Sequence, residues 1–254
     1  MLLEPKPTQR IERLNLAEQI VQRILAVRDK QVLAIGLYGS LARGTDQLYS
    51  DIEMKCVLNT EEEDYSWEWI ENGCKIEVNF ESEDVILNEA ATVDESWAIT
   101  HGAYFDLKRL YGSHDFFIKL QNTLKSLPQE LFIDAIREII IGNIYEDIGK
   151  LRNSLLAGNM GYLPLLACSI VEQGALAIGL AHKKCYSTRA LVLKESLEFD
   201  NRPHGYEKLC QMVMEGNLND FDTITTTLEM FWVGLVEWAE ENSFNLEKRC
   251  IAPL

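Results

Sequence analysis

Hydrophobic residues recur with two different periods along this chain. In the first half, a continuous apolar run at 32–38 predicts a buried β-strand. After it the residues alternate, so that Ile52 and Met54 would face one side of a strand and Asp51 and Glu53 the other. Short strands are therefore expected early in the chain.

Two more segments complete this first half. Residues 75–80 alternate polar and apolar side chains, as a half-buried strand does. Residues 8–29 instead carry apolar side chains at helical spacing, which predicts an amphipathic helix packed on the core. The apolar positions of that helix include Ile11, Leu14, Ile20, Val21, Ile24 and Leu25.

The second half has the pattern of long helices joined by brief turns. Pro128 suits the first turn of a helix, so we place a boundary there, with 1–127 as one domain and 128–254 as the other. This order of elements predicts an α+β protein, in which a mixed sheet with helices is followed by an all-α helical bundle. The expected helices of the bundle span 129–157, 163–182, 187–198, 204–215 and 221–243.

The charge balance narrows the possible partners. Lys+Arg 24 against Asp+Glu 40 gives a formal net charge of −16. The field of such a protein attracts small polycations, whereas a nucleic acid needs a basic surface, so no nucleic-acid partner is expected. The densest acidic run, at 61–64 with Glu68 and Glu71 after it, has an ordinary alternative as a solvated helix face.

No membrane or secretion segment is expected. The apolar stretch at 162–181 is interrupted by Pro164, Glu172 and Gln173, which suits a buried helix better than a membrane span. The six cysteines are scattered without a C-x-x-C pair, so they indicate reduced packing residues rather than a zinc site or a disulfide framework. We therefore expect a cytoplasmic protein.

A Gly-Ser turn follows the first predicted strand. Gly39 lets the backbone come close to phosphate oxygens, and Ser40 adds a hydroxyl. A short helix after the turn would point its first N–H groups at the same place. The turn is therefore predicted to bind a triphosphate.

Two carboxylates come soon after this turn. On a strand, Asp51 and Glu53 at i and i+2 project from one face and repel each other unless a cation neutralises them. Mg²⁺ suits such a site because it takes one or two protein carboxylates and fills its other positions with water and phosphate oxygens. A solvated acidic strand end is the alternative for the pair alone, but Gly-Ser and Arg43 at this distance favour magnesium.

A third carboxylate can come from the strand at 75–80. Glu77 shares the polar face of that strand with Lys75 and Asn79. A glutamate in an alternating strand is usually just its solvated side, but beside the preceding motif Glu77 becomes a candidate ligand. Lys75 and Glu68 are candidate substrate contacts.

Glu146 and Lys150 stand at i and i+4 in the long helix expected at 129–157, so they share one helical face. Spacing alone favours an ordinary surface ion pair, which contributes little to stability. A functional role for this pair needs support from another source.

Taken together, these motifs resemble the DNA polymerase beta-like nucleotidyltransferase superfamily and, more closely, the kanamycin nucleotidyltransferase family of aminoglycoside 4'-nucleotidyltransferases. The resemblance runs over nearly the whole chain, and the order of the matching segments makes it specific. Those segments are residues 39–46, 49–54, 75–80, 100–102 and 149–153, and the pairs at 231–232 and 237–238.

The resemblance implies a reaction. A nucleoside monophosphate, typically AMP from magnesium-bound ATP, would be transferred to the 4'-hydroxyl of a kanamycin-like aminoglycoside, with release of pyrophosphate and inactivation of the antibiotic. The resemblance also implies a homodimer in which each active site takes groups from both subunits.

Roles follow residue by residue. Glu146 matches the general base that contacts the attacking hydroxyl, and Lys150 matches a phosphate-contacting lysine. The remaining implied roles are triphosphate binding for Gly39, Ser40 and Arg43, metal binding for Asp51 and Glu53, and metal or amine binding for Glu77.

One departure concerns the drug pocket. Where the family has an acidic residue one helical turn before the base, this chain has Gly142, which removes a contact to a polyamine. Two alternatives stay open: the same chemistry with a protein or tRNA acceptor, and a nucleotide-sensing module without turnover. The acidic composition disfavours tRNA. The full set of Asp51, Glu53, Glu77 and Glu146 disfavours a module that only binds.

Overall fold

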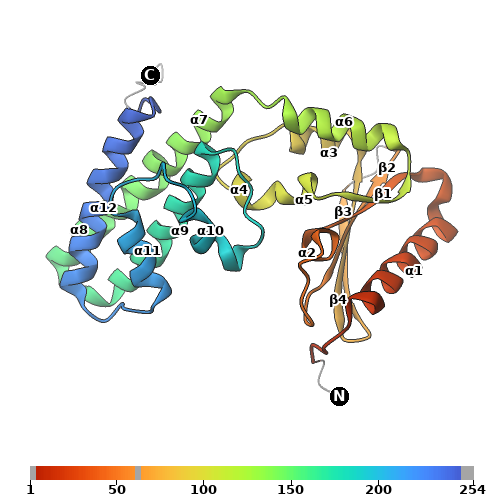
Figure 1. The fold of residues 1–254 in the computed structure, drawn as a ribbon, viewed down its shortest axis with the longest axis horizontal. Helices are drawn as coiled ribbons and strands as arrows, with labels where there is room; N and C mark the ends of the chain where they lie inside the picture. The colour runs from red at the N-terminus through yellow and green to blue at the C-terminus, as the bar shows by residue number, and fades with distance from the viewer. Residues whose placement is uncertain (1–3, 61–63, 247–254) are drawn as a thin grey trace. The chain divides into compact units, whose positions relative to one another are not determined.

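The computed structural model describes residues 4–60 and 64–246. The chain forms two units, one made of Met1–Thr92 with Thr100–Leu127 and the other of Val93–Ile99 with Pro128–Leu254. The first unit is a sheet with helices and the second is helical (Figure 1). The predicted α+β fold is therefore confirmed, although the short segment 93–99 lies in the helical unit.

A mixed sheet is the centre of the N-terminal unit. Within the described residues its strands lie in the order β3-β4-β2-β1-β5. Strands β2 and β4 run parallel, and the other neighbouring pairs are antiparallel. The strands are β1 (Val32–Tyr38), β2 (Ile52–Leu58), β3 (Tyr65–Glu71), β4 (Cys74–Ser82) and β5 (Lys108–Gly112).

Strand β3 corrects the reading of the acidic run as a solvated helix face. Part of that run, 61–63, lies outside the described residues, but Glu68 and Glu71 are in the strand. Tyr65 stacks on Phe80 of β4, with ring centroids 4.7 Å apart, and the packing of such alternate aromatic residues favours a strand over a helix.

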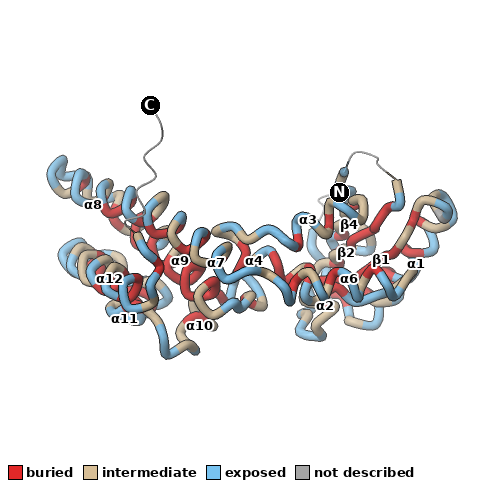
Figure 2. The backbone as a smooth tube through the Cα atoms, turned by 90° about the horizontal axis from the view of Figure 1, so that it is seen from above, coloured by how far each residue is buried: buried red, intermediate tan, exposed pale blue. Residues whose placement is uncertain are grey.

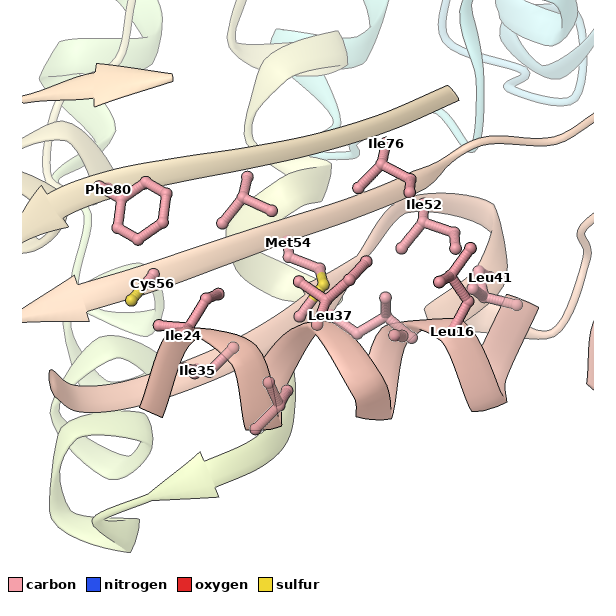
Figure 3. Packing of buried hydrophobic residues seen from close by; sticks show 14 of the residues in the cluster. Leu16, Ile24, Ile35, Leu37, Leu41, Ile52, Met54, Cys56, Ile76 and Phe80 are labelled. Atoms are coloured by element: carbon pink, nitrogen blue, oxygen red, sulfur yellow. The ribbon is translucent and has the colours of Figure 1, made fainter. Parts of the chain in front are cut away.

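Helix α1 (Arg10–Arg28) covers one face of the sheet. Its apolar stripe, which includes Leu16 and Ile24, packs on the inward residues of β1, β2 and β4 (Figure 3). In β2 and β4 these inward residues alternate strictly, with Met54 and Val78 fully buried. The amphipathic helix expected at 8–29 is thus present as α1, but Ile11, which was expected in its apolar stripe, is exposed because it lies in the first turn.

The opposite face carries the polar side chains of the site and is covered in part by α3 (Glu83–Ala90) and α6 (His114–Lys125). Ile86 and Phe116 from these helices pack on Val57 of β2. Two shorter helices complete the unit, α2 (Gly39–Arg43) directly after β1 and α5 (Gly102–Phe105) before β5.

Helix α9 (Leu163–Ala181) is the central element of the C-terminal unit, and buried positions gather along it (Figure 2). Among the described residues one stretch, Met160–Ala181, is long and apolar enough to cross a membrane, but 67% of its most apolar window is buried inside the unit. This burial agrees with the predicted core helix.

The short segment η1 (Asp29–Gln31) links α1 to β1 in the N-terminal unit. The helical segments that contact α9 are α7 (Gln129–Arg137), η2 (Glu138–Ile144), α8 (Tyr145–Ala157), η3 (Met160–Tyr162), α10 (Val192–Ser196), α11 (Tyr206–Met214) and α12 (Phe221–Glu241), and the remaining ones are α4 (Trp97–Thr100) and η4 (Arg189–Leu191). The long helix expected at 129–157 is present, but η2 is a π-helical segment within it.

The segment 93–99 joins the helical unit through Trp97. Its indole is 1% exposed and meets the ring of Phe132 edge-on, with centroids 4.8 Å apart. The next residue, Ala98, accepts a backbone hydrogen bond from Tyr186, with an N···O distance of 2.7 Å. A side chain and a backbone bond therefore fix this segment in the helical unit.

Trp97→Ala is expected to lower the free energy of unfolding by about 3–5 kcal/mol, because it leaves a large cavity in a packed core. Urea unfolding followed by circular dichroism measures the change. Trp67→Ala is the matched control, since the indole of Trp67 is 51% exposed and its removal should cost much less. Equal losses in the two variants would contradict the role of Trp97.

Candidate active site

Four side chains form a row across the sheet. Tyr38 of β1 is the register partner of Glu53 of β2, Glu53 is that of Glu77 of β4, and Glu77 is that of Glu68 of β3. Register partners project from the same face of a sheet, here the face partly covered by α3 and α6. The fold therefore brings three predicted carboxylates onto neighbouring strands.

Asp51 adds a fourth negative charge beside the Glu53 position of this row. It lies just before β2, two residues from Glu53, and is half-buried. Burial, followed by the negative charges of Asp51 and Glu77, raises the pKa of Glu53 to about 7. The shift shows that these three carboxylates are close enough to repel one another.

Gly39 brings the Gly-Ser turn against this charge. Its φ is +71°, a left-handed conformation, and a Cβ at this position would lie 1.8 Å from Oε2 of Glu53. Only glycine lets the turn adopt this backbone and touch the carboxylate. Ser40 follows in α2, as predicted, and is half-buried.

Arg43 lies at the end of α2 and also acts on this site. Its Nη1 is 2.5 Å from Oδ2 of Asp106, which follows α5, and both side chains are partly exposed. Its positive charge opposes the rise in the pKa of Glu53. Arg43 is therefore beside the carboxylate row, and Asp106 orients it.

The substrate candidates Lys75 and Glu68 are also brought together. Lys75 Nζ lies 3.0 Å from Oε2 of Glu68 and 3.5 Å from Oε2 of Glu77. The hydrogen bond to Glu68 is the main cause of the raised pKa of Lys75. This group marks the open, more exposed end of the row, because Glu68 and Lys75 are about half exposed.

Glu146 and Lys150 are side by side on α8, but this helix belongs to the C-terminal unit. Lys150 Nζ lies 2.9 Å from Oε1 of Glu146 and 2.9 Å from Oδ1 of Asp147. Asp147 is buried and accepts a hydrogen bond of 3.0 Å from Ser169 Oγ. Hydrogen bonds to Asp147 and Glu146 hold the pKa of Lys150 above its ordinary range, so the lysine is fixed as a cation.

The π-helical segment η2 lies directly before these residues and contains Gly142. A Cβ at Gly142 would lie 2.5 Å from Oε1 of Glu138, so the Glu138 carboxylate lies over the glycine. A carboxylate from a residue four positions earlier therefore lies beside position 142. π-Helical turns occur frequently at functional sites.

Magnesium fits the chemistry of the carboxylate row. Within the described residues, no three His, Cys, Asp or Glu side chains form a complete metal-binding cluster. Mg²⁺ does not need one, because it binds through one or two carboxylates together with substrate phosphates and water. The contact of Glu53 with the Gly39 turn places such oxygens next to the predicted phosphate position.

Three contributors to the geometry were not predicted from sequence. Asp106 is 63 residues from Arg43 in the sequence. Asp147 has no sequence feature that distinguishes it from other acidic residues in helices. Glu138 reaches Gly142 only because of the local helix geometry. Asn79 shares the predicted polar face with Glu77, and this alternation is the sequence signal for its place beside the site.

Comparison with known proteins agrees with the fold. Residues 114–245 match the family model of the KNTase C-terminal domain. A solved nucleotidyltransferase-like protein from Exiguobacterium sibiricum has a similar fold, with a TM-score of 0.57 and 11% identity, covering 91% of this chain and 77% of that one. The protein is thus of the nucleotidyltransferase class.

Closer relatives define the family. Proteins named aminoglycoside nucleotidyltransferase (4') from Staphylococcus aureus and from a Bacillus species are each 42% identical over 235 residues, covering 92% of this chain and 93% of theirs. The chain belongs to the aminoglycoside 4'-nucleotidyltransferase family, as the motifs indicated.

In protein freed of divalent cations, Glu53→Gln is expected to raise the free energy of unfolding by about 1–3 kcal/mol near pH 8. Folding raises the pKa of Glu53 from 4.5 to about 7, so ionisation of this carboxylate costs stability as the pH rises through that window. Glutamine does not ionise and escapes the cost.

The gain should vanish near pH 4, where Glu53 is largely protonated in the folded and the unfolded state. Urea unfolding at the two pH values, with a chelator present, measures it. The same gain at both values would show that the substitution acts by packing and not by charge.

Proposed function

We propose that this protein transfers AMP from ATP, or another nucleoside monophosphate from its triphosphate, to the 4'-hydroxyl of a kanamycin-like aminoglycoside. Pyrophosphate is released and the antibiotic is inactivated. The single observation that carries the proposal is the contact between the Gly39 turn and Glu53, in register with Glu77. This contact supports the proposal because it brings the turn proposed to bind phosphate against a carboxylate proposed to bind the cation. Family membership supplies the acceptor.

Asp51 and Glu53, with Glu77, would hold Mg²⁺ in the working enzyme. A bound Mg²⁺ supplies positive charge to the phosphate oxygens and lowers the electrostatic cost of bringing a triphosphate to an acidic site. Ser40 offers its hydroxyl and Arg43 its guanidinium to the same phosphates. Arg43 must then share or leave its ion pair with Asp106.

Glu146 is proposed as the general base. Its carboxylate accepts the proton of the 4'-hydroxyl while the hydroxyl oxygen forms a bond to the α-phosphorus and the bond to pyrophosphate breaks. The side chain is 65% exposed, so an incoming hydroxyl can reach it. Lys150, fixed by Asp147, is proposed to neutralise charge on the phosphates.

Carboxylates surround the proposed drug position. Glu68 and Glu77 would attract the ammonium groups of the aminoglycoside, and Lys75 would donate to its hydroxyls. The net charge of −16 favours the approach of a polycation over long distances. We also propose a cytoplasmic homodimer with shared sites, as the resemblance implies.

The protein is expected to release pyrophosphate from ATP and Mg²⁺ only when kanamycin or tobramycin is added. A coupled pyrophosphate assay measures this release, and mass spectrometry of the drug detects the added AMP. An aminoglycoside without a 4'-hydroxyl should give no release. No drug-dependent release from any aminoglycoside with a 4'-hydroxyl would refute the proposed function.

Asp51→Asn should abolish turnover because it removes a metal-binding charge, whereas Asp84→Asn on the exposed side of α3 should leave turnover at the wild-type level. Each of the two variants loses one carboxylate, so the difference between their turnover rates measures the specific role of Asp51. A protein or tRNA acceptor would instead appear as labelled AMP on macromolecules without any drug present.

Glu146→Gln should reduce kcat by about 10²–10⁴-fold, the usual contribution of a general base, with ATP binding retained. Pyrophosphate release gives kcat, and calorimetry with an unreactive ATP analogue gives the binding constant. Unchanged kcat would exclude Glu146 as the base. Mixing this variant with Asp51→Asn should restore part of the activity if each site draws on two subunits.

A further inference from the structure

Tyr38, Asn79 and Glu77 form a closed triangle of hydrogen bonds. Tyr38 Oη donates to Oε1 of Glu77 at 3.3 Å and accepts from Nδ2 of Asn79 at 3.0 Å. The same Nδ2 donates its second hydrogen to Oε1 of Glu77, also at 3.0 Å. One oxygen of Glu77 therefore receives two donors from the protein itself.

The triangle links strands that do not touch. Tyr38 is the last residue of β1 and Glu77 lies on β4, with Glu53 of β2 in register between them. The phenol thus extends past Glu53 to reach Glu77. Because Gly39 follows Tyr38 directly, the residue just before the predicted phosphate turn also holds the farther carboxylate.

The two oxygens of Glu77 have different surroundings. Oε1 accepts both hydrogen bonds of the triangle, whereas Oε2 lies 3.5 Å from Nζ of Lys75, which it shares with Glu68. Lys75 lies toward the exposed end of the row. Oε2 is therefore the oxygen of Glu77 that the triangle leaves unused.

Tyr38 is suited to act as a permanent donor. Its side chain is 7% exposed and packs with Val57, Tyr104 and Leu107, so the ring has little freedom to rotate. The buried hydroxyl is therefore held beside Oε1 of Glu77.

We propose that Tyr38, together with Asn79, is a positioning residue that holds Oε1 of Glu77 and so presents Oε2 to the metal ion or to an ammonium group of the drug. The proposal rests on the proposed function, because it assumes that Glu77 faces a cation in the working site. Residues that orient metal-binding carboxylates generally change affinity by about 10–100-fold when removed.

The test is Tyr38→Phe, which deletes the hydroxyl and keeps the ring. Two probes are titrated into the whole protein: Mn²⁺, followed by electron paramagnetic resonance with an unreactive ATP analogue present, and kanamycin, followed by calorimetry. We expect at least one of the two affinities to fall about 10-fold. Asn79→Ala should act in the same direction, and the double variant should lose less than the product of both effects.

Tyr104→Phe is the matched control. This tyrosine is buried to the same degree in the same cluster, but its hydroxyl donates to Glu89 and not to the carboxylate row. The Tyr104→Phe variant should bind both probes with the affinity of the wild type. Melting temperatures of the two variants report the structural cost of losing a buried hydroxyl.

Each outcome decides the proposal. Weaker binding in Tyr38→Phe alone supports it, and wild-type binding in Tyr38→Phe, or equal losses in both variants, overturns it. If the wild type binds the probes but transfers no nucleotide, the proposed function fails. The same titrations then still decide whether Tyr38 positions Glu77. A wild-type protein that binds neither probe would overturn both.

Discussion

The parallel pairing of β2 with β4 is the constraint on which the rest of the site depends. It sets Glu53 beside Glu77, and the antiparallel neighbours extend the row to Tyr38 and Glu68. A slip of one residue would turn every side chain of a strand to the other face. The slip is prevented by the buried residues that alternate with the carboxylates and pack on α1. Hydrophobic packing on one face thus maintains charge repulsion on the other.

The repulsion is not relieved by the buried lysine of the same strand. Lys55 projects from the same face of β2 as Glu53 and is 5% exposed, yet its Nζ lies 2.7 Å from Oε2 of Glu81 and 4.9 Å from the centre of the Tyr104 ring. Its charge is therefore matched by Glu81. The carboxylate row keeps an excess of negative charge, as a site for an external cation requires.

The sequence predicted what depends on local periodicity. Alternation placed Asp51 and Glu53 on one face and Glu77 on another strand, and helical spacing paired Glu146 with Lys150. It could not predict which strands would be neighbours, so the reach of Tyr38 to Glu77 and the pairing of Arg43 with Asp106 were not foreseen. These contacts are set by tertiary register. Strand β3 was missed because acidic residues obscure its aromatic alternation, and β5 because it is short and begins with Lys108 and Arg109.

The excursion of residues 93–99 into the helical unit has a consequence for the history of such chains. Neither unit is a single stretch of sequence, because the chain passes between them three times, after Thr92, Ile99 and Leu127. The matched family model even begins at residue 114, inside α6 of the sheet unit. A recombination event that moved 1–127 as one cassette would carry Trp97 away from Phe132 and leave its indole uncovered. Any exchange at this boundary must therefore bring in a helical unit that can cover Trp97, which constrains recombination there.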